Sequence, residues 1–354
     1  MPQDKPCPKL KPWVDFIDQQ RLIFGKLYDA LGSETRVFEN RDVMERLWKG
    51  RSPRRPIGDE TFFRFFMRDS VEKPVAAIIS ELAKIEKVRE AFDIGDGVDF
   101  EDRQDFVIDA FGAAYDRRVL FPCTPGSYAD QPSVQQELVC VVDWVLPHML
   151  TASRLRVGLH EMDVYEEVAN RESMLPACGN STARFRYHAE IEEGLEYGLV
   201  SMGEATVFLK VEWDEPGSLY YHLAEFGPEV SAHPSNAPIC TAVGQHLAFT
   251  LMLLRQQDQR SLEERRKATV DLKSWKADFV ELWRCIPESE RWASPEDCHE
   301  PITYEGIDRS PNFPASEQID ETLLSKDENL EPSEDESTSS WQDVGDWRDL
   351  YSCA

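Results

Sequence analysis

Three short apolar segments follow one another between residues 197 and 226, and they constrain the fold more than any other part of the sequence. They read YGLVSMG, ATVFLKVEW and SLYYHLAEF, and the tetrapeptide DEPG separates the last two. Short runs rich in β-branched and aromatic residues, bounded by turn residues, are typical of β-strands, and DEPG predicts a hairpin turn. We therefore expect three neighbouring strands of one β-sheet here.

A further buried strand, ELVCVVDWVL at residues 137–146, carries a single acid, Asp143. It is the first clear buried strand along the chain, and Pro147 and His148 follow it. An unpaired buried carboxylate is costly, so such a residue is usually paired, bound to a metal or active in chemistry. Asp143 is therefore the first candidate site residue.

Helical spacing of apolar residues predicts the elements that cover this sheet. Asp59 is the expected N-cap of the second helix and Pro74 its expected break, while residues 94–100 form a turn into a short strand. The second half of the last helix is charged, so we expect it to project toward solvent. The predicted helices span residues 12–31, 60–92, 160–171, 183–197 and 241–279.

The expected fold class is α/β, with α+β as the alternative, in a single domain. N-terminal helices are followed by a mixed sheet flanked by helices. Residues 1–58 form an N-terminal helix and linker, residues 59–286 form the domain, and residues 287–354 form an acidic tail. That tail is rich in Pro, Ser and acids and lacks periodicity, which predicts disorder.

The charge is strongly negative, with a net value of −27, and it is uneven. Residues 286–354 hold 19 Asp and Glu against 4 Lys and Arg, which leaves 47 acids and 35 bases for the preceding residues. Nonspecific binding of nucleic acid needs a basic surface, so this balance disfavours it. The best local basic patch is KGRSPRRP, residues 49–56, and the acidic tail favours a protein partner.

No standard catalytic or metal-binding motif occurs. The eight cysteines lack zinc spacing, and His148, His160, Glu161 and Asp163 match no standard metal pattern. No apolar run approaches the roughly 20 residues that cross a bilayer, and the N-terminus lacks a secretory signal. We expect no membrane association, and a cytoplasmic or nuclear protein with free thiols.

Several motifs give the chain a resemblance to a known family. They are GLEYG, GEA-x-x-FL-[KR]-V, YY-x-L and TAVGQ-x-LAFTL, preceded by VEKPV and GVDFED. They resemble a group of fungal proteins that carry a PD-(D/E)XK, restriction-endonuclease-like nuclease domain, often beside a protein-kinase-like domain. The resemblance covers roughly residues 60–287 and is most specific over residues 194–254. It implies a restriction-endonuclease-like mixed sheet.

The resemblance also implies a metal site. In that family a strand reads acid-x-Lys before a Pro-His pair: the acid holds Mg²⁺ or Mn²⁺, and the lysine orients the attacking water. Asp143 takes the acid position, but Val145 stands where the lysine belongs. Glu72 of VEKPV is the second metal-ligand candidate. For a further acid on the preceding strand, residues 122–136 offer only Asp130.

Two functions follow from this resemblance. The first is a catalytically degenerate nuclease-like protein, without cofactor, that acts as a binding or accessory module. The alternative is an active divalent-metal nuclease in which Lys210, on the FLKV strand, replaces the missing lysine and acts with Asp143 and Glu72. A simpler reading of Asp143 is that it pairs with Arg154 or Arg156.

Overall fold

The three segments between residues 197 and 226 form antiparallel strands, as predicted. They are β7 (Tyr197–Ser201), β8 (Ala205–Val211) and β9 (Ser218–Glu225). In the DEPG turn the Glu215 amide donates to the Glu212 carbonyl at 2.8 Å, and the Ser218 amide donates to the Glu215 carbonyl at 3.0 Å. The hairpin prediction is confirmed.

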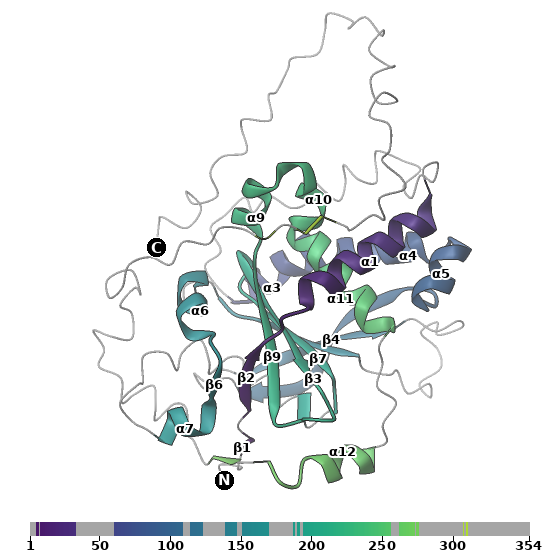
Figure 1. The fold of residues 1–354 in the computed structure, drawn as a ribbon. Coiled ribbons are helices and arrows are strands. Elements are labelled where there is room, and N and C mark those ends of the chain that lie inside the picture. The colour runs from purple at the N-terminus through teal and green to yellow at the C-terminus, as the bar shows by residue number, and fades with distance from the viewer. Residues whose placement is uncertain are drawn as a thin grey trace, which may run out of the picture.

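The computed structural model describes residues 5–6, 8–32, 60–108, 114–122, 139–146, 151–169, 187, 190–191, 194–255, 262–272, 274–275, 307 and 309–310. Within them an eight-stranded mixed sheet has the order β3-β4-β5-β7-β8-β9-β2-β6 (Figure 1). The pairs β5–β7 and β9–β2 are parallel, and the other pairs are antiparallel. The remaining strands of this sheet are β2 (Lys9–Pro12), β3 (Val98–Ile108), β4 (Ala114–Pro122), β5 (Cys140–Trp144) and β6 (Met162–Asp163). The mixed α/β class is confirmed.

Two long strands precede β5, where the sequence predicted only one short strand. β3 has 11 residues and pairs with β4 along its length, with an irregularity between Arg103 and Phe106. β3 is an edge strand of the sheet, and an edge strand needs no continuous apolar run. Its sequence, VDFEDRQDFVI, is rich in charged residues, so a search for apolar runs does not find the whole strand. The strand β5 is therefore an interior strand between β4 and β7.

The predicted first helix begins later than expected. Residues Lys9 to Pro12 form β2, which lies parallel to β9, and the amide of Trp13 donates to the Tyr221 carbonyl at 2.7 Å. The helix α1 then spans Phe16–Leu31 and ends at Gly32, whose φ of 65° suits glycine. The apolar periodicity of the helix was correct, but it could not show that the preceding residues join a sheet.

The helical stretch at residues 60–92 is broken after residue 82, not at Pro74. It comprises α3 (Glu60–Met67), the π-helical turn η1 (Arg68–Glu72), α4 (Lys73–Leu82) and α5 (Glu86–Phe92). The Lys73 amide bonds to the Arg68 carbonyl, and Pro74 lies in the first turn of α4, where its missing N–H costs little. Asp59, the expected N-cap, lies outside the described residues.

Two other predicted helices are shorter than expected. The helix α11 spans Ala242–Arg255, and a separate α12 (Leu262–Ala268) leads to β10 (Ser274–Trp275), which pairs with β1 (Lys5–Pro6). One continuous helix over residues 241–279 is thus wrong, because turn residues follow α12.

Residues 160–171 likewise hold β6 and then α7 (Val164–Ala169), preceded by α6 (Ala152–Gly158). Between β9 and α11 lie α9 (Phe226–Ala232), η2 (Pro234–Asn236) and α10 (Ala237–Cys240). Of residues 183–197, Tyr187, Glu190 and Ile191 are helical, and Tyr197 starts β7.

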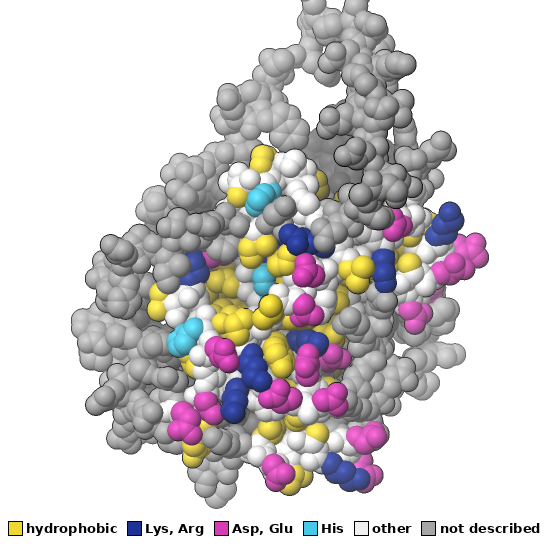
Figure 2. All heavy atoms as spheres, viewed as in Figure 1, with side chains coloured by type: hydrophobic (Ala, Val, Ile, Leu, Met, Phe, Trp, Pro, Cys, Tyr) yellow, Lys and Arg dark blue, Asp and Glu magenta, His cyan; other side chains and the backbone are white. Residues whose placement is uncertain are grey.

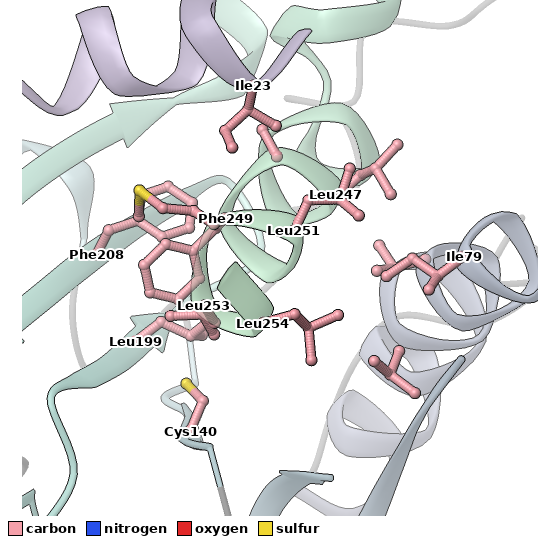
Figure 3. Close-up of a cluster of buried hydrophobic side chains, with 14 of the residues drawn as sticks. Ile23, Ile79, Cys140, Leu199, Phe208, Leu247, Phe249, Leu251, Leu253 and Leu254 are labelled. Atoms are coloured by element: carbon pink, nitrogen blue, oxygen red, sulfur yellow. The ribbon is translucent and has the colours of Figure 1, made fainter. Parts of the chain in front are cut away.

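Two hydrophobic clusters lie on the two faces of the sheet. The first cluster packs α1, α4 and α11 on one face, where Phe249 of α11 lies beside Phe208 of the sheet and Ile79 of α4 lies on the far side of α11 (Figure 3). The second cluster packs α6 and Tyr187 on the other face, against Val200 and Val207 among others. Residues of α1, from the predicted segment 1–58, therefore share one core with the predicted domain.

Within the described residues, no helix alone has the length and apolar composition to cross a membrane. Among the described residues one pair of helices, Pro234–Cys240 and Ala242–Leu254, has this length and composition when taken together, and the two helices are bent by 52° relative to each other.

The predicted tail, residues 287–354, is described only at Ile307, Arg309 and Ser310. Arg309 is fully buried against the body. The predicted disorder of the other residues falls outside the described part of the chain.

Candidate functional site

Asp143 is buried in an interior strand, as its sequence context predicted. It is 7% exposed, and β5 is buried along its length. Its neighbours Val142 and Trp144 belong to the first cluster, so strand alternation directs Asp143 to the opposite face. Its partner across the parallel ladder is Val200, a member of the second cluster.

Val145 occupies the position expected of the catalytic lysine, and it is half-buried against the second cluster. Its amide donates to the Ser201 carbonyl at 2.9 Å, which continues the ladder one residue beyond β5. An isopropyl side chain offers neither charge nor a hydrogen bond at this point. The trailing Pro147 and His148 lie outside the described residues.

Glu72 lies in the helical layer over the first face. It is 2% exposed, at the end of η1, and its neighbour Val71 packs in the first cluster. η1 contacts α11, which covers the same face. Glu72 and Asp143 thus come from opposite sides of the sheet plane, and the fold does not bring this predicted pair of metal ligands to one face.

Lys210 is also on the first face. Its ladder partner is Tyr197 of the first cluster, and its ammonium group lies 5.6 Å from the centroid of the Trp13 ring. Lys210 Nζ is 2.9 Å from Glu212 Oε1. Because Asp143 faces the other way, this placement does not supply the lysine that the alternative function requires.

Arg156, one of the two arginines predicted to pair with Asp143, forms an ion pair with Glu225. Arg156 Nη2 donates to Glu225 Oε2 at 3.3 Å, and its Nε lies 2.9 Å from Glu225 Oε1. Burial raises the pKa of the Glu225 carboxyl, while Arg156 opposes that shift. Arg156 is therefore engaged with Glu225, and the side chain of Arg154 lies outside the described residues.

The strand that precedes β5 is β4, so the search for a second strand acid moves earlier in the sequence. Asp130 lies outside the described residues, whereas Asp116 lies within β4, paired in register with Phe106. β4 thus carries Asp116, which lies outside the segment 122–136 that was searched for this acid.

Metal binding by the predicted residues is not supported by their placement. Among the described residues no three His, Cys, Asp or Glu side chains gather as a metal site. Glu72 lies in the layer over the first face of the sheet, whereas Asp143 is directed to the second face. We therefore derive no catalytic step through Mg²⁺ or Mn²⁺.

The most polar buried site is instead an arginine cage, formed by Gln20 of α1, His222 of β9 and Glu229 of α9 around Arg309. Arg309 and Glu229 are both 0% exposed. Arg309 Nε donates to Glu229 Oε2, its Nη2 donates to Glu229 Oε1 at 2.9 Å, and its Nη1 donates to Gln20 Oε1. Such two-point pairing is the strongest geometry for guanidinium and carboxylate.

The other polar groups of the arginine cage are oriented by the body. Gln245 Nε2 donates to Glu229 Oε2 at 2.7 Å, and the Glu225 amide donates to Glu229 Oε1 at 3.2 Å. His222 Nε2 lies 3.2 Å from Arg309 Nη2. Burial, and then the Arg309 charge, lower the pKa of His222 well below its usual value, so the ring is neutral. Because a guanidinium group can only donate, Nε2 is the acceptor in this contact.

A second buried polar group joins Ser201, Thr206 and His246. Thr206 Oγ1 donates to Ser201 Oγ at 2.8 Å and lies 3.2 Å from His246 Nε2, and Ser201 Oγ donates to the Ala205 carbonyl. Burial lowers the pKa of His246 to about 3. All three side chains are buried, so this chain of hydrogen bonds ties α11 to the sheet and has no access to substrate.

These contacts explain part of the motif TAVGQ-x-LAFTL in physical terms. Gln245 orients the Glu229 carboxylate, His246 bonds to Thr206, and a Cβ on Gly244 would meet the Pro238 carbonyl oxygen at 2.2 Å. The motif drew attention to Gly244 and Gln245 in the sequence, but it did not indicate which residues they contact. Arg309 had a weak signal, as one of four bases among 19 acids.

The described surface mixes both signs of charge. On the face in Figure 2, acidic side chains lie between the basic ones, with no continuous basic area among the described residues. The patch predicted at residues 49–56 lies outside them.

Comparison with known proteins gave no match among family models, curated proteins or solved structures.

Proposed function

We propose that this protein is a catalytically degenerate, nuclease-like protein that serves as a binding or accessory module. The observation that carries the proposal is Asp143. It is a buried acid on an interior strand, followed by Val145 where a catalytic lysine would stand. The nearest sequence candidate for a substitute, Lys210, lies on the other face and pairs with Glu212.

The order of the elements supports a restriction-endonuclease-like core. A helical stretch is followed by the antiparallel strands β3, β4 and β5, then by helices, then by β7 parallel to β5. The acid-bearing strand of such a core is an interior one, as β5 is. The fold alone does not give the activity, because the chemistry depends on the residues at the strand end.

The partner proposed for this module is a basic protein surface. Residues 286–354 carry 19 acids and 4 bases, and the preceding residues are acidic as well. Opposite charge raises association rates and selects partners more than it sets affinity. The same charge repels a phosphate backbone, so nucleic acid is a less favourable ligand. Such a module acts in the cytoplasm or nucleus.

A cleavage assay tests the proposal. The full chain, Asp143→Asn and the exposed-turn control Asp96→Asn are incubated with single- and double-stranded DNA and with RNA, in Mg²⁺ or Mn²⁺. We expect no metal-dependent cleavage by any of them and no metal uptake by calorimetry. Asparagine keeps the shape of Asp143 while removing its charge, so a lost activity would not reflect lost packing.

Cleavage that Asp143→Asn abolishes and Asp96→Asn retains would make the degenerate assignment wrong. The alternative, an active divalent-metal nuclease, would then hold. The variant Lys210→Met then tests whether Lys210 replaces the missing catalytic lysine, because methionine keeps the apolar stem over Trp13 without the ammonium group. A loss of cleavage would place the ammonium group in catalysis, and retained cleavage would exclude it.

A further inference from the structure

The arginine cage is a binding site for a side chain that comes from a distant part of the chain. Every receptor group belongs to the body: Gln20 in α1, His222 in β9 and Glu229 in α9. The guanidinium follows Glu229 by 80 positions and Gln20 by 289. In Figure 1 the short yellow segment that contains Arg309 lies beside α10.

The cage satisfies the chemistry of a guanidinium group and of no smaller cation. A carboxylate accepts from two of its nitrogens, an amide oxygen accepts from the third, and the His222 Nε2 accepts a further hydrogen bond from Nη2. An ammonium group could not span these acceptors, because it is a point charge without the planar fork. Gln245 and the Glu225 amide hold the carboxylate in place from behind.

The segment beside Arg309 adds a second contact. Asn236 of η2 donates from its Nδ2 to Ser310 Oγ, and both side chains are at least partly buried. The segment is thus held at two successive residues, Arg309 by α1, β9 and α9, and Ser310 by η2. Bulk charge opposes this contact, since the tail and the preceding residues are both acidic.

We propose that the arginine cage is a guanidinium-binding site that takes an arginine side chain of an extended peptide, and that Arg309 fills it as a ligand from the same chain. The site therefore anchors the tail to the body. Covalent linkage gives Arg309 a high effective concentration, so an arginine of another peptide enters when Arg309 is removed. This inference concerns a site remote from Asp143 and does not depend on the proposed function.

Chemical rescue in the full chain tests the site. Arg309→Ala is expected to lower the Tm by about 5–10 °C, because a buried carboxylate loses its cation. Methylguanidinium at millimolar concentration should recover at least half of that loss, and methylammonium should not. The exposed-residue control Arg89→Ala should show neither the loss nor the recovery. Wild-type protein should not respond to either cation.

A peptide experiment tests the arginine as a ligand in trans. A labelled peptide of residues 304–314 should bind Arg309→Ala at least tenfold more tightly than it binds wild type. The same peptide with alanine in place of Arg309 should bind neither protein. Equal binding of the two peptides would overturn the proposal, as would an unchanged Tm of Arg309→Ala.

A further variant keeps the test decisive if Arg309→Ala does not fold. In the double variant Arg309→Ala/Glu229→Gln the carboxylate that needs a cation is gone, so folding should return and methylguanidinium should have no effect. A double variant that folds and still responds to methylguanidinium, or one that remains unfolded, would show that the cage does not act through this charge pair.

Discussion

His222 stacks on Phe16, with ring centroids 4.3 Å apart and ring planes 22° apart. The histidine therefore has an aromatic face on one side and the Arg309 guanidinium at its Nε2. Burial disfavours a positive charge on this imidazole, and the Arg309 charge disfavours it further. His246, on the sheet-facing side of α11, is likewise buried and lies within hydrogen-bond distance of Thr206.

Stability should fall as the pH is lowered from about 6.5 toward 3. Burial lowers the pKa of His246 to about 3 and that of His222 well below its usual value. In that pH range the histidines of the unfolded chain are protonated and those of the folded chain are not, so acid favours unfolding. The slope from each histidine is at most about 1.4 kcal/mol per pH unit. Urea midpoints at several pH values measure it.

The variant His246→Gln should flatten this dependence relative to wild type. The comparison cancels the other titrating groups, including Glu225, whose raised pKa makes acid stabilising at that residue alone. Parallel stability curves for the two proteins between pH 7 and 4 would contradict a neutral, buried His246.

Two glycines should respond to alanine with opposite signs. At Gly244 a Cβ would lie 2.2 Å from the Pro238 carbonyl oxygen and 2.8 Å from Ile239 Cα, so Gly244→Ala should destabilise by about 1–3 kcal/mol or more. Gly25, in the middle of α1, has nothing within 4 Å of its Cβ position. Gly25→Ala should stabilise by about 0.5–1 kcal/mol. Urea unfolding of both variants decides this; a neutral or stabilising Gly244→Ala would refute the close approach of α10 to α11.

The Arg156–Glu225 pair should show a pH-dependent cost. Glu225 is 3% exposed in its side chain, and Arg156→Met would leave that carboxylate without its cation. We expect a loss of about 2–4 kcal/mol at pH 8, which shrinks toward pH 5 as Glu225 takes up a proton. Calorimetric unfolding at the two pH values measures it. The double variant with Glu225→Gln should lose the pH dependence; if it keeps it, another group is responsible.

Thr206→Val should weaken the attachment of α11 to the sheet. Valine keeps the shape of threonine but removes the donor to Ser201 and the contact with His246, so the expected cost is about 1–3 kcal/mol. Thr61→Val, at an exposed position of α3, should change stability by less than about 0.5 kcal/mol. Equal effects in thermal unfolding would show that the buried hydroxyl contributes nothing specific.

The sequence predicted local elements well and their partners poorly. The strands β7, β8 and β9 have short apolar runs and a turn between them, so local pattern sufficed. The burial of Asp143 followed in the same way. The face of each strand residue depends on register with strands far along the chain, which is why Lys210 and Asp143 looked compatible in sequence.

Arg309 shows the same limit more strongly. Composition marks its surroundings as a disordered acidic tail, and that average is dominated by residues other than the one that is buried. One or two residues can dock within a segment whose average composition predicts disorder. Asp116 is a milder case, since the polar character of β4 concealed a strand that pairing with β3 and β5 makes evident.

The position of β2 has a consequence for the order in which the protein folds. Lys9 and Leu10 pair with Ser218 and Leu219 on one side and with Asp163 and Met162 on the other. Among the strands of the eight-stranded sheet β2 is synthesised first, yet its neighbour β9 is made more than 200 positions later. β6 can join the sheet only through β2. This edge is therefore completed late, at the entropic cost of closing a very long loop, and it should be the slowest part of folding.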